Sequence, residues 1–330
     1  MSEAPALSDA EAVKAQGLRG IAFDAFKKRE PGGVILQATL GLILIVAVIV
    51  GLFGFIGWRS VVDYMQWVAQ ITAAQQQDPS AALAPGAMMP PASVMMAGNL
   101  LFVVQLVLYI VIAAYEAAIL RWLTRGERGG VFLGLGFGAD TWYVWFSYWI
   151  WYFLVFGVFL AVLFVGLIIG AVMAAAQMSA AVIAAAMGLL GLAIVVGCIY
   201  FAVRLAPAAA TSVILRRFAF FDALKVTRDR FWPVFGAFLV IVLLSFVTAA
   251  LAAGVGAVTL LAELIAGLAN DSGQPDPAAT MALVFSPAMI ARWGVLYLVL
   301  LLLQLIWTIA TYGLNARAAK LALAEGRIER

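Results

Sequence analysis

Six long apolar runs, separated by shorter polar stretches, set the pattern of this 330-residue chain. They lie near residues 34–57, 99–121, 147–174, 181–203, 234–262 and 292–314. Each run is long enough to cross a hydrocarbon core of about 30 Å as a helix, which takes roughly 20 residues. The pattern predicts an all-α, polytopic membrane protein with a six-span membrane domain over residues 34–314. The fifth run continues to about Leu268, so its helix must tilt, break near Gly254 and Gly256, or project beyond the bilayer.

Amphipathic stretches flank and connect these runs. In residues 1–33 a helix is expected from about Asp9, lying on the cytoplasmic surface, with one apolar face made of Leu18, Ile21, Ala22, Ala25 and Phe26. Residues 204–235 interleave six basic residues with apolar ones. That pattern is typical of a helix lying in the membrane interface, with its basic side toward lipid phosphates. Residues 315–330 form a basic tail.

The basic residues predict the orientation of the chain. Of 20 Lys and Arg residues, 18 lie in the N-terminal segment, the 121–146 and 204–233 loops, and the C-terminal tail. Only Arg59 and Arg292 lie in the other loops. By the positive-inside rule, both termini are cytoplasmic and the spans form three hairpins joined by basic, cytoplasmic interfacial helices.

Composition narrows the class of protein further. Hydrophobic residues make up 65% of the chain and charged residues 11%, against about 45–50% and 25% in soluble domains. The chain has no histidine, which excludes a Ser-His-Asp triad, a His-zinc site and a His-ligated haem. No nucleophile–base pair can be named. We therefore expect a non-enzymatic protein with no cofactor, no metal and no nucleic-acid partner.

Short segments recur along the chain. The matched pairs are EPGGVIL (30–36) with ERGGVFL (127–133), FDAFK (23–27) with FDALK (221–225), and AAILRW (117–122) with SVILRRF (212–218). Each match lies where an inward-returning span ends or an outgoing one begins. The matches predict an internal repeat of three units, an arrangement common in transporters and also found in scaffolds.

The stretch from 204 to 232 also carries a family-like pattern. An arginine leads into a small-residue run ending in Pro, and an aliphatic run, an Ala-Leu pair and Thr-Arg-x-x-x-Trp follow. The residues concerned are Arg204, Pro207, Ala223, Leu224, Thr227, Arg228 and Trp232. The pattern resembles the membrane domain associated with bacterial glycerophosphodiester phosphodiesterases and related six-span inner-membrane proteins. It departs from that family at Arg216 and Lys225, where the family often has an acidic residue and an arginine.

The resemblance implies a six-span fold, lipid-rich surroundings and a location in the bacterial inner membrane, which the chain crosses several times. It does not imply the hydrolase activity, because the chain lacks the histidines and the metal-binding carboxylate cluster of the hydrolase's soluble barrel.

Three polar residues lie inside predicted spans. A carboxylate in a membrane helix is a functional hypothesis by default. Glu116 lies roughly one turn from Arg121, near the cytoplasmic end of its span. It therefore pairs with Arg121 or Arg204, extends its carboxylate to the interface, or handles protons or a substrate. Gln105 and Gln304 lie deeper, where interhelical hydrogen bonding is expected.

Two functions from different classes fit these features. The first is a non-enzymatic envelope protein that binds anionic lipid, or a membrane-protein partner or second copy, through its arginines. The candidates are Arg121, Arg204, Arg216, Arg217 and Arg228. A plainer interpretation is that they only set topology. The second function is a transporter or flippase for a lipid or amphiphilic small molecule, which predicts a cavity around Glu116 where a scaffold would have a closed bundle.

Overall fold

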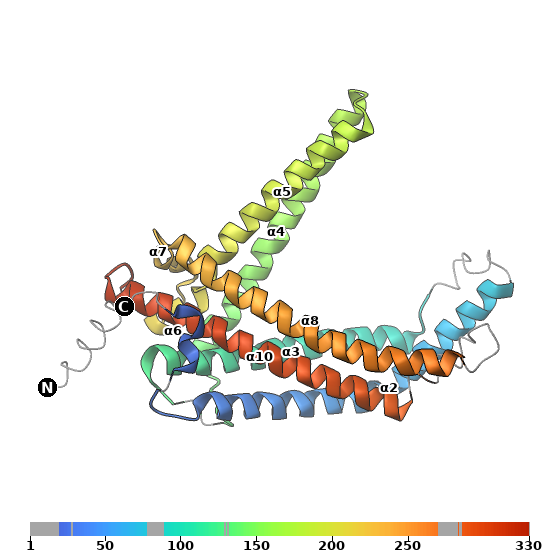
Figure 1. Ribbon diagram of the computed structural model, residues 1–330, viewed down its shortest axis with the longest axis horizontal. Helices are drawn as coiled ribbons and strands as arrows, with labels where there is room; N and C mark the ends of the chain where they lie inside the picture. The colour runs from blue at the N-terminus through green and yellow to red at the C-terminus, as the bar shows by residue number, and fades with distance from the viewer. Residues whose placement is uncertain are drawn as a thin grey trace. The chain divides into compact units, whose positions relative to one another are not determined.

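The computed structural model describes residues 20–27, 29–77, 89–128, 130, 132–269, 283 and 286–329. Within these residues the chain is helical, without a β-strand, which confirms the predicted all-α class. Its six long helices are α2 (Val34–Gln77), α3 (Ala92–Arg125), α4 (Ala139–Ala175), α5 (Ala180–Leu205), α8 (Phe231–Ala269) and α10 (Pro287–Ala324) (Figure 1). Each contains one predicted span and is long and apolar enough to cross a membrane. The protein is therefore a multi-pass integral membrane protein.

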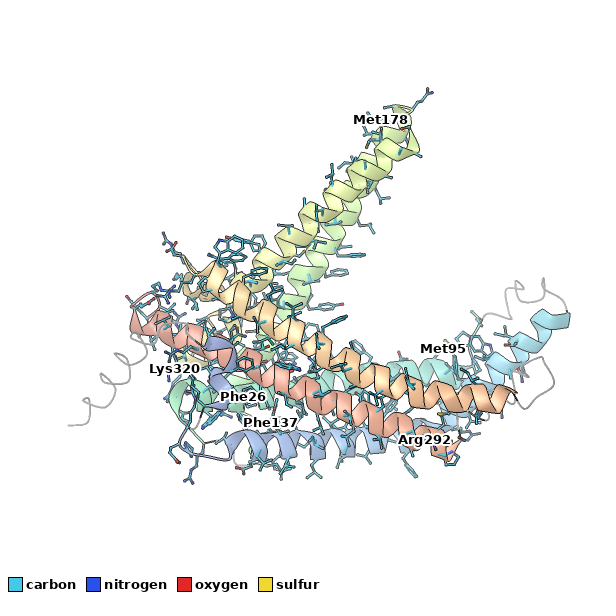
Figure 2. The ribbon with its side chains drawn as sticks, in the orientation of Figure 1. Phe26, Met95, Phe137, Met178, Arg292 and Lys320 are labelled. Carbon is cyan, nitrogen blue, oxygen red and sulfur yellow. The ribbon has the colours of Figure 1, made fainter. Side chains whose placement is uncertain are left out.

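The long helices carry apolar side chains on surfaces that no other described part of the chain covers. Large exposed residues run along α2, α4, α5 and α8, among them Phe55, Phe164, Leu189 and Val258. In water this surface would be strongly unfavourable, but in a bilayer lipid tails cover it. Figure 2 shows such side chains along the pair formed by α4 and α5, which pack against each other, with Met178 in the turn between them.

The fifth span does not break. Helix α8 runs continuously through Gly254 and Gly256, so of the three arrangements predicted for this span, breakage is wrong. A Cβ atom at Gly256 would lie 2.5 Å from Leu296 of α10. Glycine at this position therefore allows α8 and α10 to approach closely. At 39 residues, α8 is about 58 Å long and exceeds the hydrocarbon thickness unless it tilts strongly or projects from the bilayer.

The chain divides into two compact units. Unit 1 comprises residues 1–39, 113–242 and 308–330, and unit 2 comprises residues 40–112 and 243–307. Unit 1 contains all of α4 and α5, the first residues of α2 and α8 and the last residues of α3 and α10. All six helix ends that the charge pattern predicts to be cytoplasmic therefore lie in unit 1, together with the turn between α4 and α5. Within unit 2, the Trp307 indole N–H donates to the Thr248 hydroxyl at 2.9 Å.

The core of unit 1 is built from small apolar residues on three helices. Ala113, Ala117 and Ala118 of α3 and Ala310 and Ala319 of α10 are fully enclosed. Helix α6 (Ala208–Leu215) contributes eight buried residues. Because alanine side chains are short, the backbones of these helices can pack closely.

The predicted interfacial helix over 204–235 is not present as one helix. After α5 the chain forms the buried α6, a 3₁₀ helix η3 (Phe220–Asp222), the short α7 (Ala223–Val226) and then α8. Arg216 and Asp229 adopt left-handed backbone conformations, with φ of 54° and 61°. This conformation ends a right-handed helix, so the stretch turns at these two points. Its basic residues therefore lie mainly on turns, whereas α6 lies in the core.

The N-terminal amphipathic segment also differs from its prediction. Its beginning near Asp9 lies outside the described residues, and residues 21–26 form a 3₁₀ helix, η1 (Ile21–Phe26). Of the predicted apolar face, Ile21, Ala22 and Ala25 are buried against protein, whereas Phe26 is 47% exposed. Ala25 lies directly against Gly313 of α10, where an added Cβ atom would be 2.6 Å from the Ala25 nitrogen.

The predicted C-terminal tail begins as helix. Residues 315–324 are the last turns of α10, and Ala316, Leu321 and Ile328 are buried. The tail is thus packed into unit 1.

One of the three sequence matches has matching local structure. In FDAFK and FDALK, a 3₁₀ helix places the aspartate three residues before a lysine that pairs with it, at 2.9 Å and 2.8 Å. By contrast, residues 30–36 lead into α2, whereas the described part of 127–133 lies in the loop before α4. The threefold repeat stays a prediction.

The contact between η1 and α10 predicts a sharp difference between two glycines of one helix. Gly313→Ala should destabilise the protein by about 1–3 kcal/mol, because the methyl group has no space. Gly294→Ala is the matched control: nothing lies within 4 Å of its added Cβ, so it should be neutral or slightly stabilising. Chemical unfolding in detergent measures both. Equal stability of the two variants would contradict the packing of η1 on α10.

Candidate functional site

In unit 1, three aspartates each lie between two basic side chains. The groups are Asp24 with Lys27 and Arg29, Asp140 with Arg121 and Arg125, and Asp222 with Arg217 and Lys225. The first lies before α2, the second at the start of α4 and the third before α8. They differ in exposure, and this difference separates cations that hold the fold together from cations that are available to a ligand.

Arg125 is enclosed, with 9% of its side chain exposed. Its guanidinium contacts Asp140 of α4 at 2.6 Å and Glu127 at 2.8 Å, and donates to the Val213 carbonyl in the last turn of α6 at 2.9 Å. It thereby joins α3, α4 and α6. Asp140 lies in the first turn of α4, where a negative charge also complements the helix dipole.

Arg121, a candidate lipid ligand, lies in the same enclosed group. Its Nε atom is 3.9 Å from Asp140, and Nε and Nη2 are buried without a hydrogen-bond partner among the described residues. The backbone of Gly136 covers it, since an added Cβ atom there would be 2.6 Å from Nη2. A lipid phosphate could not reach these nitrogens without displacing the loop before α4, which contains Gly136.

Arg204 fastens α5 to α7. Its guanidinium donates to the carbonyls of Leu224 at 3.0 Å and Thr227 at 3.4 Å, and the Thr227 hydroxyl donates back to the Arg204 carbonyl at 3.1 Å. The last carbonyls of a helix have no intrahelical partner, and Arg204 satisfies them here. Arg204, Leu224 and Thr227 belong to the family-like pattern, so part of that pattern makes an internal contact.

Arg327 makes a second contact with α7 that the sequence pattern did not reveal. Its Nη1 donates to the carbonyls of Lys225, Val226 and Arg228. The neighbouring Glu325 pairs with Arg230 and with Arg327 itself. Because about a hundred residues separate the partners, no local signal indicates this contact.

The exposed cations lie on α7 and on the turns between α6 and α8. The exposed fractions of the Arg216, Arg217 and Arg228 side chains are 71%, 52% and 76%, and that of Lys225 is 65%. Large aromatic side chains are exposed beside them, including Trp232 in the first turn of α8, at 74%. We call this surface the basic-aromatic corner; it comprises Arg216, Arg217, Phe218, Phe221, Lys225, Arg228 and Trp232.

Carboxylates pair with every cation of the basic-aromatic corner. Glu127 contacts Arg216 at 2.7 Å, Asp222 contacts Arg217 and Lys225 at 2.9 and 2.8 Å, and Asp229 lies 3.8 Å from Arg228. Hydrogen bonds from Lys225, and secondarily from Arg217, lower the pKa of Asp222 below its usual 3.8. Asp222 is therefore ionised at neutral pH. Exposed ion pairs of this kind are weak, so an anionic ligand can compete for these cations.

Glu116 is buried, but its expected pairing with Arg121 or Arg204 is wrong. Its carboxyl accepts a hydrogen bond from the Tyr148 hydroxyl of α4, and the Tyr312 hydroxyl of α10 is also within hydrogen-bonding reach. Five residues carry the chain about 140° around a helix, so Arg121 points to a different side of α3. Tyr115, next to Glu116, shares a hydrogen bond with Thr39 of α2 at 3.1 Å.

The two glutamines are exposed on their helices. The Gln105 amide donates to the Tyr109 hydroxyl at 3.2 Å, one turn along the same helix. This contact is intrahelical, where an interhelical one was expected. Gln304 lies on α10. The described residues contain no cluster of three or more His, Cys, Asp or Glu side chains able to hold a metal ion.

Comparisons with protein-family models, with curated proteins and with solved structures found no match to this chain. The resemblance to the phosphodiesterase-associated membrane domain therefore stays a prediction.

The two kinds of arginine predict opposite responses to mutation. Arg125→Gln should cost about 3–5 kcal/mol of stability, because it leaves the enclosed Asp140 without its closest cation. Arg216→Gln, which removes an exposed ion pair with the neighbouring Glu127, should cost no more than about 1 kcal/mol. Thermal unfolding in nanodiscs measures both, and a larger loss for Arg216→Gln would contradict this assignment of the two arginines.

Proposed function

We propose that this integral membrane protein is a non-enzymatic binder of anionic lipid, and that the basic-aromatic corner holds the lipid headgroups. The observation that carries the proposal is the exposure of four cations among large aromatic side chains in unit 1, which contains the helix ends predicted to be cytoplasmic. Cations near a membrane surface attract anionic lipid with about 1 kcal/mol each. Exposed Trp and Phe side chains favour the interfacial region of a bilayer.

The proposal assigns the five candidate arginines to two roles. The proposed lipid ligands are the exposed Arg216, Arg217 and Arg228. Their side chains pair with carboxylates on their own turns or in the neighbouring loop. Arg121 and Arg204 are engaged within unit 1, and their role is to fix the corner's shape. In this proposal the corner faces the cytoplasmic leaflet of a bacterial inner membrane, where anionic lipids are available.

A transporter or flippase is the weaker alternative. It requires access to Glu116, but that side chain is 7% exposed and tyrosine hydroxyls from two other helices contact its carboxyl. This arrangement favours a closed bundle around Glu116. A membrane-protein partner could also use the corner; it would displace lipid in the test below and appear as an added mass.

Removing charge at the corner should remove bound lipid. In native mass spectrometry, the Arg216→Gln/Arg217→Gln variant should bind anionic phospholipid roughly 10- to 30-fold more weakly, from about 1 kcal/mol per cation. Zwitterionic lipid should be unaffected. Arg59→Gln, which removes an exposed arginine of unit 2, is the control for net charge. Unchanged anionic lipid in the double variant would refute the proposal.

Removing a competing carboxylate should have the opposite effect. Asp222→Asn frees Arg217 and Lys225, so anionic-lipid affinity should rise about fivefold, which corresponds to roughly 1 kcal/mol. Because the lowered pKa keeps Asp222 ionised around neutral pH, the wild-type affinity should show no step from this residue in that range. A decrease in affinity in Asp222→Asn would show that Asp222 helps to form the binding surface and that its competition with lipid is not the dominant effect.

A further inference from the structure

Glu116 differs from the other enclosed carboxylates of unit 1. Asp24 and Asp140 are each held by two cations. In the described part of the chain, Glu116 has no arginine or lysine as an ion-pair partner, and the groups that contact its carboxyl are tyrosine hydroxyls. A carboxylate enclosed in a membrane protein without a counter-charge is strongly unfavourable.

The contacts around Glu116 form a triangle. Tyr148 contacts Glu116, Tyr312 contacts Glu116, and the two tyrosine hydroxyls lie within hydrogen-bonding reach of each other. Three hydrogen bonds need three polar hydrogens. Each tyrosine supplies one, and an ionised glutamate supplies none, whereas a neutral carboxyl supplies the third.

We propose that Glu116 is a proton-binding site whose neutral carboxyl closes this triangle and so holds α3 against α4 and α10. In the closed arrangement Tyr148 donates to Glu116, Glu116 donates to Tyr312, and Tyr312 donates to Tyr148. Loss of the proton to water leaves two hydrogens for three contacts and places an unpaired charge in the core. The contact between the three helices then opens.

Among the described residues, the titratable groups that adjoin Glu116 are three tyrosines. From α4 the facing titratable group is Tyr148, from α10 it is Tyr312, and beside Glu116 on α3 it is Tyr115. Tyr115 is engaged by the Thr39 hydroxyl of α2 and is in edge contact with the Tyr312 ring, with 6.3 Å between ring centroids. It therefore supports the triangle without being part of it.

Infrared difference spectroscopy of the full-length protein in nanodiscs tests the proposal. At neutral pH, the spectrum of wild type minus Glu116→Gln should contain the C=O stretching band of a protonated carboxylic acid. In Tyr148→Phe that band should shift, because the carboxyl loses a donor, while Tyr115→Phe should leave it in place. A difference spectrum that contains only carboxylate bands would overturn the proposal.

Stability against pH gives an independent measure. The folded protein holds a proton that the unfolded chain releases, so wild-type stability should fall as pH rises, and Glu116→Gln should remove this slope. An identical slope in both proteins would also overturn the proposal. If Glu116→Gln does not fold, the Tyr148→Phe spectrum decides: a shifted carboxylic-acid band supports the neutral carboxyl, and shifted carboxylate bands refute it.

Discussion

The structure depends on satisfying backbone carbonyls and charges where six helices end close together. A helix leaves its last carbonyls without intrahelical partners, and neither these nor buried charges are tolerated without partners away from water. In unit 1, arginines meet this need. Arg204 and Arg327 donate to the carbonyls of α7, and Arg125 joins the carboxylate of Asp140 to the end of α6. These contacts fix the turns after α6 and so position the exposed cations.

The same residue type therefore serves two purposes in one small region. An arginine has five donors in a planar fork, so it can bind several carbonyls and a carboxylate at once. Where the side chain is enclosed, as in Arg125, this holds helices together. Where it is exposed, as in Arg228, the pairing carboxylates are weak competitors and an anionic headgroup can replace them. In our account, exposed arginines bind lipid and enclosed arginines hold the helices together.

Much of the fold was predictable from the sequence, because a membrane span needs a minimum apolar length and that length can be read directly. The spans of all six long helices follow from it. The path between α5 and α8 did not follow, because the amphipathic pattern of residues 204–235 fits both an interfacial helix and a buried α6 with turns. In the structure, left-handed backbone conformations at Arg216 and Asp229 turn the chain between α6 and α8. Neither residue is a glycine, so the sequence does not mark these turns.

The candidate site was predictable in composition but not in geometry. Counting basic residues predicts which side of the membrane they occupy, yet it cannot separate Arg121, which a loop covers, from Arg216, which is exposed. Partners distant in sequence, such as Arg327 and Val226, leave no local pattern. For Glu116 the nearest charged residue in sequence was the wrong partner, because it lies on another side of the helix.

The most direct test of the account is the side of the membrane on which the basic-aromatic corner lies. In a Cys198→Ala background, single cysteines at Arg216, Arg228 and Arg59 can be labelled with a membrane-impermeant maleimide in sealed right-side-out vesicles, before and after lysis. We predict labelling at position 59 in intact vesicles, and at positions 216 and 228 only after lysis. Labelling of all three positions from the same side would contradict the predicted topology and the placement of the corner at the cytoplasmic leaflet.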